Sequence, residues 1–162
     1  MKFLATFTIA LTLIMPMSLK ADDTTNSHVG DLQVMFDEVT RTVEAGDFDA
    51  MAATYHKDAI LVTANSSLPI SKAIASWRVD GKKLADEGST ATVSFRFSDH
   101  KHGETTSFET GIFRYSITNS KGEETAFLAH FQELLIKQGG KWLCMMEHQI
   151  KSATQAEWDA LK

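Results

Sequence analysis

The stretch VEAGDFDAMAATYHKDAILV, residues 43–62, contains the end of one helix, a short second helix and a buried strand. Gly46 is expected to end the first helix in the left-handed conformation, and Asp47 is expected to cap the second. The apolar stripe of the second helix consists of Phe48, Met51, Ala52 and Tyr55. The apolar run AILVT, residues 59–63, predicts a buried strand.

The segments on either side of this stretch also predict helices. Upstream, apolar residues recur every three or four positions, as in an amphipathic helix: Val29, Leu32, Met35, Phe36, Val39 and Val43. Downstream, NSSLP (residues 65–69) predicts a turn. Ser71 is then expected to cap a third helix, with Ile74 and Trp77 on its inner side and Gly88 near its end.

The second half of the chain alternates apolar and polar residues, which is typical of half-buried strands. Strands are predicted at about 92–97, 106–118, 124–137 and 141–151, separated by the turn-like sequences DHKHGE, NSKG and QGG. Such short turns predict an antiparallel meander. Three helices followed by a sheet indicate an α+β domain with the helices on one face of the sheet. After it, residues 153–162 predict a tail or a short helix capped by Ser152.

The first residues have the composition of a secretory signal. Lys2 precedes the uncharged run FLATFTIALTLIMPM, and Ala21 stands before a polar segment. The apolar run is short for a membrane span. We therefore expect residues 1–21 to be a signal peptide and residues 22–28 a polar leader. The protein is then periplasmic or secreted, with no membrane attachment after cleavage; a signal anchor is the alternative.

The charge of the chain indicates no nucleic-acid partner. The formal net charge is -5, and loss of Lys2 and Lys20 with the signal would make the mature chain more acidic. Its basic residues are scattered and form no positively charged stretch. The single cysteine, Cys144, allows no intrachain disulfide, and its apolar surroundings predict a buried, unreactive thiol.

The residues quoted above, with the strand GGKWLCMMEHQIKS at 139–152, resemble the nuclear transport factor 2-like superfamily. Within it the chain is most similar to the SnoaL-like and ketosteroid-isomerase-like proteins, and closest to domain of unknown function 4440. The resemblance covers roughly residues 29–152. It implies a cystatin-like cone, in which a curved antiparallel sheet wraps around the three N-terminal helices and leaves an apolar pocket. It also implies a homodimer formed through the sheet.

The ketosteroid isomerases of this superfamily use a tyrosine, a carboxylate base and a protonated aspartate. Carried over by motif, these three positions fall on Val39, Thr63 and Ala129. None of these side chains can move a proton or hold an enolate. The resemblance therefore does not extend to that machinery.

The last hairpin contains the polar residues that remain as candidates. If QGG is a three-residue loop, His130 lies opposite His148, and Phe131 lies opposite Glu147. Both faces of this hairpin are apolar, which predicts that helices cover one face and a partner chain the other. The sequence leaves open which face lines the pocket. His100 and His102 are expected to be solvated in a turn, and no metal or cofactor is predicted.

These observations give two sets of candidate site residues. The catalytic candidates are His130, Glu147 and His148. The candidates for contact with a small hydrophobic molecule are Tyr55, Trp77, Phe131 and Met146. The sequence does not decide whether the protein is an enzyme.

Three function classes remain. The first is a secreted or periplasmic small-molecule-binding domain with an apolar conical pocket. The second is a SnoaL-like or ketosteroid-isomerase-like enzyme, acting as an isomerase, cyclase, dehydratase or hydrolase through His and Glu acid–base chemistry. The third is a dimerisation or assembly domain.

Overall fold

The computed structural model describes residues 23–161, with side chains from residue 30 onward. The predicted signal peptide, residues 1–21, lies outside the described residues, and the first helix begins within the predicted leader. Four helices and six strands follow one another along the described chain: α1 (Asp23–Ala45), α2 (Phe48–Ala52), β1 (Tyr55–Thr63), β2 (Ser67–Pro69), α3 (Ile70–Asp86), β3 (Thr90–His102), β4 (Thr106–Thr118), β5 (Glu124–Gln138), β6 (Lys141–Ser152) and α4 (Gln155–Ala160). Among these helices, none is both long and apolar enough to cross a membrane.

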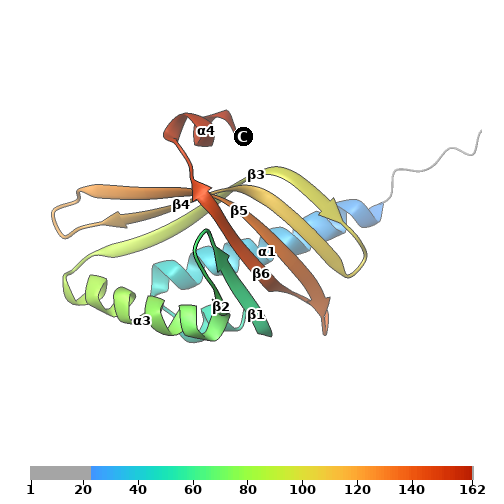
Figure 1. Cartoon of the computed structure of the whole chain (residues 1–162), viewed down its shortest axis with the longest axis horizontal. Coiled ribbons are helices and arrows are strands. Elements are labelled where there is room, and N and C mark those ends of the chain that lie inside the picture. Colours follow the sequence, from blue (N-terminus) through green and yellow to red (C-terminus); the bar gives the residue numbers. More distant parts are fainter. Residues whose placement is uncertain (1–22, 162) are drawn as a thin grey trace, which may run out of the picture.

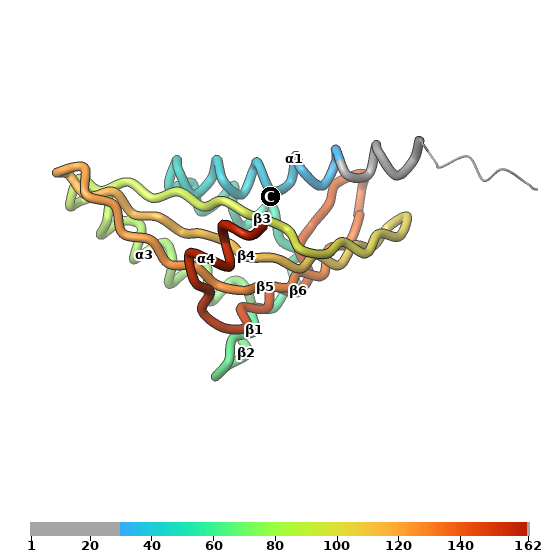
Figure 2. Tube along the Cα trace, turned by 90° about the horizontal axis from the view of Figure 1, so that it is seen from above, coloured from blue at the N-terminus to red at the C-terminus, as the bar shows by residue number. Residues whose placement is uncertain are grey.

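The strands form one curved sheet in the order β2-β1-β6-β5-β4-β3 (Figure 1). Neighbouring strands are antiparallel, except that β1 runs parallel to β6. Helix α1 extends along one face of the sheet (Figure 2), which we call the inner face. The opposite, outer face is partly covered by α4, because Arg96 donates hydrogen bonds to the carbonyl oxygens of Trp158 and Leu161. The predicted α+β class and the helix-backed sheet are therefore confirmed.

The sequence signals for the ends of the helices were mostly correct. Gly46 has a φ of 62° after α1, and the side chain of Asp47 accepts a hydrogen bond from the backbone of Ala50. Gly88 has a φ of 72° after α3. The cap of α3 was predicted wrongly: its N-cap is Pro69, which contributes no side-chain hydrogen bond. The cap of α4 was also wrong, because Thr154 caps this helix in place of Ser152.

Two strands are longer than predicted. Tyr55, expected on the apolar stripe of α2, is the first residue of β1, and Asp58 lies within that strand. Strand β3 continues through the expected DHKHGE turn as far as His102. The prediction that His100 and His102 lie in a turn was therefore wrong, since both pair with residues of β4. The alternating pattern ends before them because β3 contains an irregularity between Phe97 and Asp99.

The predicted pairing of the last hairpin was wrong as well. His130 lies opposite Lys151, and His148 lies opposite Gln132. The turn is shorter than expected, because Gln138 pairs with Lys141. The register then shifts twice, between Leu134 and Leu135 and again between His130 and Phe131. Each shift adds a residue on β6, so the two histidines are no longer opposite one another.

The shift near Leu135 explains why both faces of β6 looked apolar in the sequence. On the N-terminal side of this shift in β6, Trp142 and Cys144 share a face with Leu135. On its C-terminal side, Glu147 lies on that same face. The even-numbered residues face α1 at the start of the strand, and the odd-numbered residues face it further on. No single alternation describes the whole strand.

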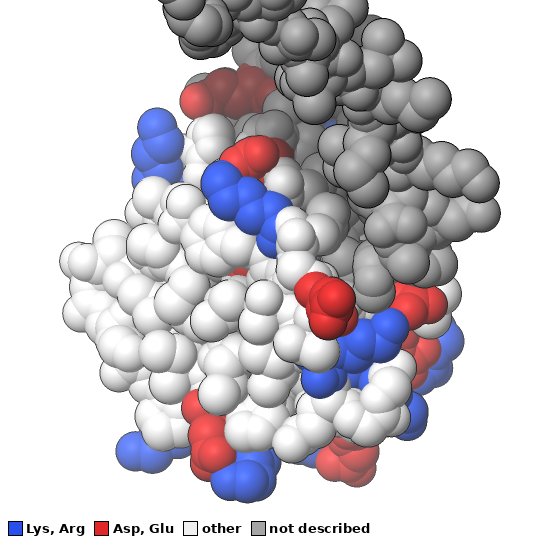
Figure 3. All heavy atoms as spheres, turned by 90° about the vertical axis from the view of Figure 1, so that its right-hand side faces the viewer, with Lys and Arg blue, Asp and Glu red and all other residues white. Residues whose placement is uncertain are grey.

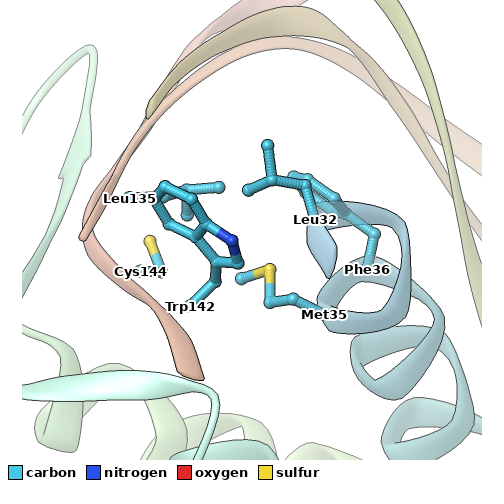
Figure 4. Close-up of a cluster of buried hydrophobic side chains, with 6 residues drawn as sticks. All are labelled: Leu32, Met35, Phe36, Leu135, Trp142 and Cys144. Carbon is cyan, nitrogen blue, oxygen red and sulfur yellow. The ribbon is translucent and has the colours of Figure 1, made fainter. Parts of the chain in front are cut away.

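The core lies between α1 and the inner face of the sheet. Figure 4 shows Leu32, Met35 and Phe36 of α1 directed toward Leu135, Trp142 and Cys144. A second cluster joins α3 to β1, and a third, around Phe131, joins β3, β4 and β5. Cys144 is 1% exposed, and burial raises the pKa of its thiol well above the usual value, as expected for an unreactive cysteine.

On the face shown in Figure 3, the charged side chains do not form a separate positive area and negative area. Lys and Arg alternate there with Asp and Glu around an uncharged central area.

Candidate functional site

Three glutamates lie side by side on the inner face of the sheet. Glu109 of β4 is directly opposite Glu133 of β5, which is directly opposite Glu147 of β6. They are 1%, 5% and 8% exposed, respectively. We call this set the carboxyl row. Directly opposed residues of adjacent strands project from the same face, and carboxyl groups are seldom buried without strong partners. A row of three therefore marks this part of the sheet as a candidate site.

Glu147 has two polar partners. The Tyr55 hydroxyl donates a 2.7 Å hydrogen bond to its Oε2, and the Gln149 amide donates a 2.7 Å hydrogen bond to its Oε1. Burial raises the pKa of Glu147 above its usual value, and the hydrogen bonds from Gln149 and Tyr55 oppose this rise. The pKa of Tyr55 is itself raised well above 10, first by burial and then by the charge of Glu147. Tyr55 is therefore a neutral donor.

Glu133 has fewer polar partners than Glu147 in the described part of the chain. Its Oε2 is buried and has no hydrogen-bond partner among the described residues. Burial raises the pKa of Glu133 well above its usual value, and the neighbouring charges of Glu147 and Glu109 raise it further. Such surroundings favour the neutral form of a carboxyl group, which can donate a hydrogen bond. The centre of the row thus has a buried carboxyl oxygen without a hydrogen-bond partner among the described residues.

Glu109, at the other end of the row, contacts three polar side chains. Ser107 donates a hydrogen bond to its Oε1, His100 contacts its Oε2, and His102 Nδ1 lies 3.6 Å from Oε1. These partners belong to the hairpin formed by β3 and β4.

Aromatic side chains occupy the inner face next to the row. Phe131, two positions before Glu133 on β5, contacts Phe95 and Phe97 with ring centroids 5.7 and 6.0 Å apart and near-perpendicular planes. Phe36 of α1 contacts Phe97 at 4.8 Å. Phe36, Phe95 and Phe97 also line a groove of about 410 Å³ between α1 and β3, the α1–β3 groove. The aromatic rings thus connect this groove with Phe131, and His100, which contacts Glu109 of the carboxyl row, also lines the groove.

The structure brings some of the predicted site residues together. Tyr55, Phe131 and Glu147 all lie on the inner face, and Phe131 is opposite Gln149. Trp77 packs instead against the cluster between α3 and β1. Met146 lies opposite Leu134 on the outer face.

The two candidate catalytic histidines lie away from Glu147. His148 follows Glu147 in the strand and so projects from the opposite face. His130 Nε2 lies 3.2 Å from Oε1 of Glu157, a residue of α4. Neither ring is directed at the carboxyl row.

Sequence reasoning missed Glu109 and the central role of Glu133. Glu133 shares the odd-numbered alternation of Phe131 and Leu135, both fully buried. A glutamate at a core position of a strand was a usable signal. Glu109 likewise alternates with Gly111 and Phe113 on one face of β4. Its position opposite Glu133, however, can be predicted only when the register of the two strands is known.

Comparisons with known proteins rest on structure alone. No family model matches the chain, and no curated protein sequence is significantly similar to it. Solved structures do match. A conserved protein from Planctomyces limnophilus aligns with a TM-score of 0.66 at 9% identity, covering 79% of this chain and 99% of that one.

Two other solved structures carry descriptive names. An NTF-2-like protein of unknown function from Shewanella oneidensis has a TM-score of 0.59 at 17% identity, covering 76% of this chain and 99% of that chain. A ketosteroid isomerase-like protein from Erwinia carotovora has a TM-score of 0.58 at 14% identity, covering 80% and 98%. At such identities the likeness concerns the fold and not the activity. The chain has the nuclear transport factor 2-like fold, with a curved sheet closed on one side by helices.

Proposed function

We propose that the protein is a small-molecule-binding domain whose ligand is mainly apolar, uncharged and provided with one carbonyl or hydroxyl oxygen. The observation that carries this proposal is the unpartnered Oε2 of Glu133 next to the Glu147–Tyr55 hydrogen bond. The ligand oxygen would accept a hydrogen bond from the protonated form of Glu133.

The energetics of burial support a ligand at this place. A buried polar atom without a partner costs about 1–3 kcal/mol, and Glu133, between Glu109 and Glu147, has such an atom. A neutral carboxyl group is both a donor and an acceptor, which suits a carbonyl or hydroxyl group better than a charged one. An anionic ligand would meet three carboxyl groups and be disfavoured.

The aromatic cluster supports the apolar character of the ligand. Phe95 and Phe97 line the α1–β3 groove on one side and contact Phe131 on the other. Rings of this kind bind apolar ligand surface with little loss of side-chain entropy. A ligand in the groove would reach the carboxyl row by displacing these rings.

The test compares cyclic ketones with their parent hydrocarbons as additives in thermal unfolding of the purified protein. We expect saturable stabilisation that is stronger for the ketones, because a ligand that binds only the folded state raises stability. In the variant Glu133→Leu the ketone should lose its advantage over the hydrocarbon, by about fivefold in affinity for one lost hydrogen bond. The variant Glu104→Leu, at an exposed position between β3 and β4, is the matched control.

Two results would count against the proposal. One is that neither class of compound changes the unfolding temperature; this would favour the assembly-domain alternative. The other is that Glu133→Leu discriminates ketone from hydrocarbon as well as the wild type does, which would place the ligand elsewhere.

The second candidate function is an acid–base enzyme on the same groups. It is favoured by the two adjacent buried carboxyl groups, Glu133 and Glu147, whose pKa values are both raised by burial. Such a pair can hold one proton between its members and exchange it with a substrate. The roles here fall to Glu133, Glu147 and Tyr55 and not to His130 or His148.

This candidate is tested with the ketones that bind. Exchange of their α-hydrogens for deuterium in D₂O, followed by NMR, reports proton transfer directly. We expect Glu147→Gln to abolish exchange while binding persists. If the wild type binds the ketones without exchanging their α-hydrogens, the enzyme candidate is wrong and the binding domain remains.

The proposed function also includes export of the chain and its association with a second copy. The basic start and apolar run of residues 1–21 support export to the periplasm or the medium. Mass spectrometry of the protein from its native host checks this, since export predicts a chain beginning near Asp22.

A further inference from the structure

The hairpin of β3 and β4 brings Glu109, at one end of the carboxyl row, together with two histidines that the proposed function does not use. His100, His102 and Glu109 each place one potential metal-ligand atom so that all three atoms lie within 4.8 Å of one another. The two imidazole rings are stacked, with centroids 5.5 Å apart and planes inclined by 18°. Both rings are directed at the same carboxyl group, because His100 and His102 each contact Glu109.

A strand irregularity creates this arrangement. Up to Phe97, odd-numbered residues of β3 lie on the inner face, as the pairing of Phe97 with Gly111 shows. The pairing then skips Ser98, so His100 lies opposite Glu109 and His102 opposite Ser107. The extra residue moves both histidines onto the face of Glu109. A regular strand would direct them outward.

The surroundings of Glu109 have the features of a support for a metal ligand. Ser107, itself 1% exposed, donates a hydrogen bond to one oxygen of Glu109 and lies 2.8 Å from Nδ1 of His102. Hydrogen bonds of this kind fix the orientation of a ligating carboxylate. Glu109 is 1% exposed, and no lysine or arginine forms an ion pair with it among the described residues. Buried carboxyl groups in proteins are commonly paired with polar partners or coordinate metal ions.

The site is also accessible from outside. The side chains of His100 and His102 are 46% and 19% exposed, whereas Glu109 is buried at the inner end of the three-residue cluster. His100 is in addition part of the wall of the α1–β3 groove. A metal ion held here would therefore retain coordination positions open to water or to a molecule in that groove.

We propose that His100, His102 and Glu109 form a binding site for a divalent transition-metal ion of the zinc type. Two imidazole nitrogens and one carboxylate oxygen suit Zn²⁺ and the similar ions Co²⁺ and Fe²⁺. Mg²⁺ and Ca²⁺, which prefer oxygen ligands, are disfavoured by the two histidines. Binding of the ion is tested without the ligand proposed at Glu133, although Glu109 lies directly opposite Glu133.

The test is calorimetric titration of Zn²⁺ into purified protein that has been treated with a chelator and dialysed. We expect about one ion per chain, with loss of at least about tenfold in affinity in each of His100→Ala and His102→Ala. Ser107→Ala, which removes the support of Glu109, should weaken binding by about tenfold. The control is His148→Ala, whose ring lies on the outer face and should leave the affinity unchanged.

Cobalt provides a second readout. Co²⁺ bound by two histidines and a carboxylate with water should give visible absorption bands of four- or five-coordinate geometry. These bands should vanish in His100→Ala. Because the His100 ring is nearly half exposed, this variant retains the core, and circular dichroism checks that it is folded.

Three results would overturn the proposal. Absence of Zn²⁺ and Co²⁺ binding would mean that His100, His102 and Glu109 form only a hydrogen-bonded network. Equal binding by the wild type, His100→Ala and His102→Ala would assign the ion to other residues. A loss in His148→Ala as large as that in His100→Ala would do the same.

Discussion

The Tyr55 hydroxyl and Glu147 Oε2 are joined by a 2.7 Å hydrogen bond between residues that lie 92 positions apart in the chain. The contact exists because β1, which begins at Tyr55, runs parallel to β6 beside it. This hydrogen bond connects the segment of residues 43–62 with β6. It places the neutral hydroxyl of Tyr55 against the buried carboxyl group of Glu147, next to Glu133.

This carboxyl pair should make the stability of the protein depend on pH. The pKa of Glu147 is raised in the folded state above its ordinary value of 4.5. A raised pKa means that folding favours the protonated form, so the contribution of Glu147 to the unfolding free energy is largest below pH 4.5 and is lost as the pH rises through the folded-state pKa. The groups facing Glu147 are Tyr55, Glu133 and Cys144.

The variant Glu147→Gln should remove much of this dependence. Each unit by which the pKa of Glu147 is raised corresponds to about 1.4 kcal/mol lost at higher pH. Urea unfolding between about pH 4 and pH 8 measures it: the wild-type curve should decline more steeply than that of the variant. Parallel curves for the two proteins would show that Glu147 does not titrate as inferred.

Gly111 of β4 should not tolerate alanine. A Cβ at this position would lie 2.2 Å from the backbone oxygen of Arg96 and 3.0 Å from a ring carbon of Phe131. Since Arg96 is on the paired strand and cannot yield easily, we expect Gly111→Ala to lower the unfolding free energy by about 1–3 kcal/mol.

Gly30 is the matched control for this change. It lies in α1, and a Cβ there meets nothing within 4 Å. Gly30→Ala should raise the unfolding free energy by about 0.5–1 kcal/mol, since alanine is the better helix former. Urea denaturation of both variants gives the comparison, and equal effects at the two glycines would refute the steric argument.

The outer face of the sheet should mediate self-association. Leu134, Ile136, Leu143 and Met146 are half-buried there, and Ile60 is 37% exposed. An apolar sheet face that a short helix covers only in part is typical of an interface. Light scattering at micromolar concentration should show a dimer for the wild type and a monomer for Leu134→Lys. A wild-type monomer would contradict the prediction, and Val79→Lys, on the exposed side of α3, is the control.

The cap of α4 should become weaker in acid. Glu157 Oε2 accepts hydrogen bonds from the backbone and hydroxyl of Thr154, and these, with His130, lower the pKa of Glu157 from 4.5 to about 2. A lowered pKa adds stability above pH 4.5, and this stability is lost as the pH falls toward 2.

The variant Glu157→Gln tests this cap. It should unfold at a lower temperature than the wild type at pH 7, and the difference should shrink as the pH approaches 2. Asp159→Asn, in the same helix, is the control, since its carboxylate accepts only from Gln155 among the described residues. A temperature difference that is independent of pH would contradict the assigned role of Glu157.

Several elements followed directly from local sequence. Apolar residues at three- and four-residue spacing produced α1, and glycines at positions 46 and 88 ended two helices, because few other residues adopt positive φ. The strands of the meander were predicted within a few residues, since alternation of apolar and polar side chains is a local property. These signals were sufficient for the fold class and for its resemblance to the nuclear transport factor 2-like superfamily.

The site depended on features that no local pattern contains. One extra residue in β3 moves His100 and His102 onto the inner face, and extra residues in β6 separate His130 from His148 while aligning Glu147 with Glu133. An extra residue exchanges the two faces of a strand beyond it, and its position is decided by how the strand packs against its neighbours. The sequence by itself therefore determined most of the elements and their order, although the predicted turn at residues 65–69 contains the short strand β2. Only the tertiary structure decided which polar side chains meet, because the curvature of the sheet is produced by those same irregularities.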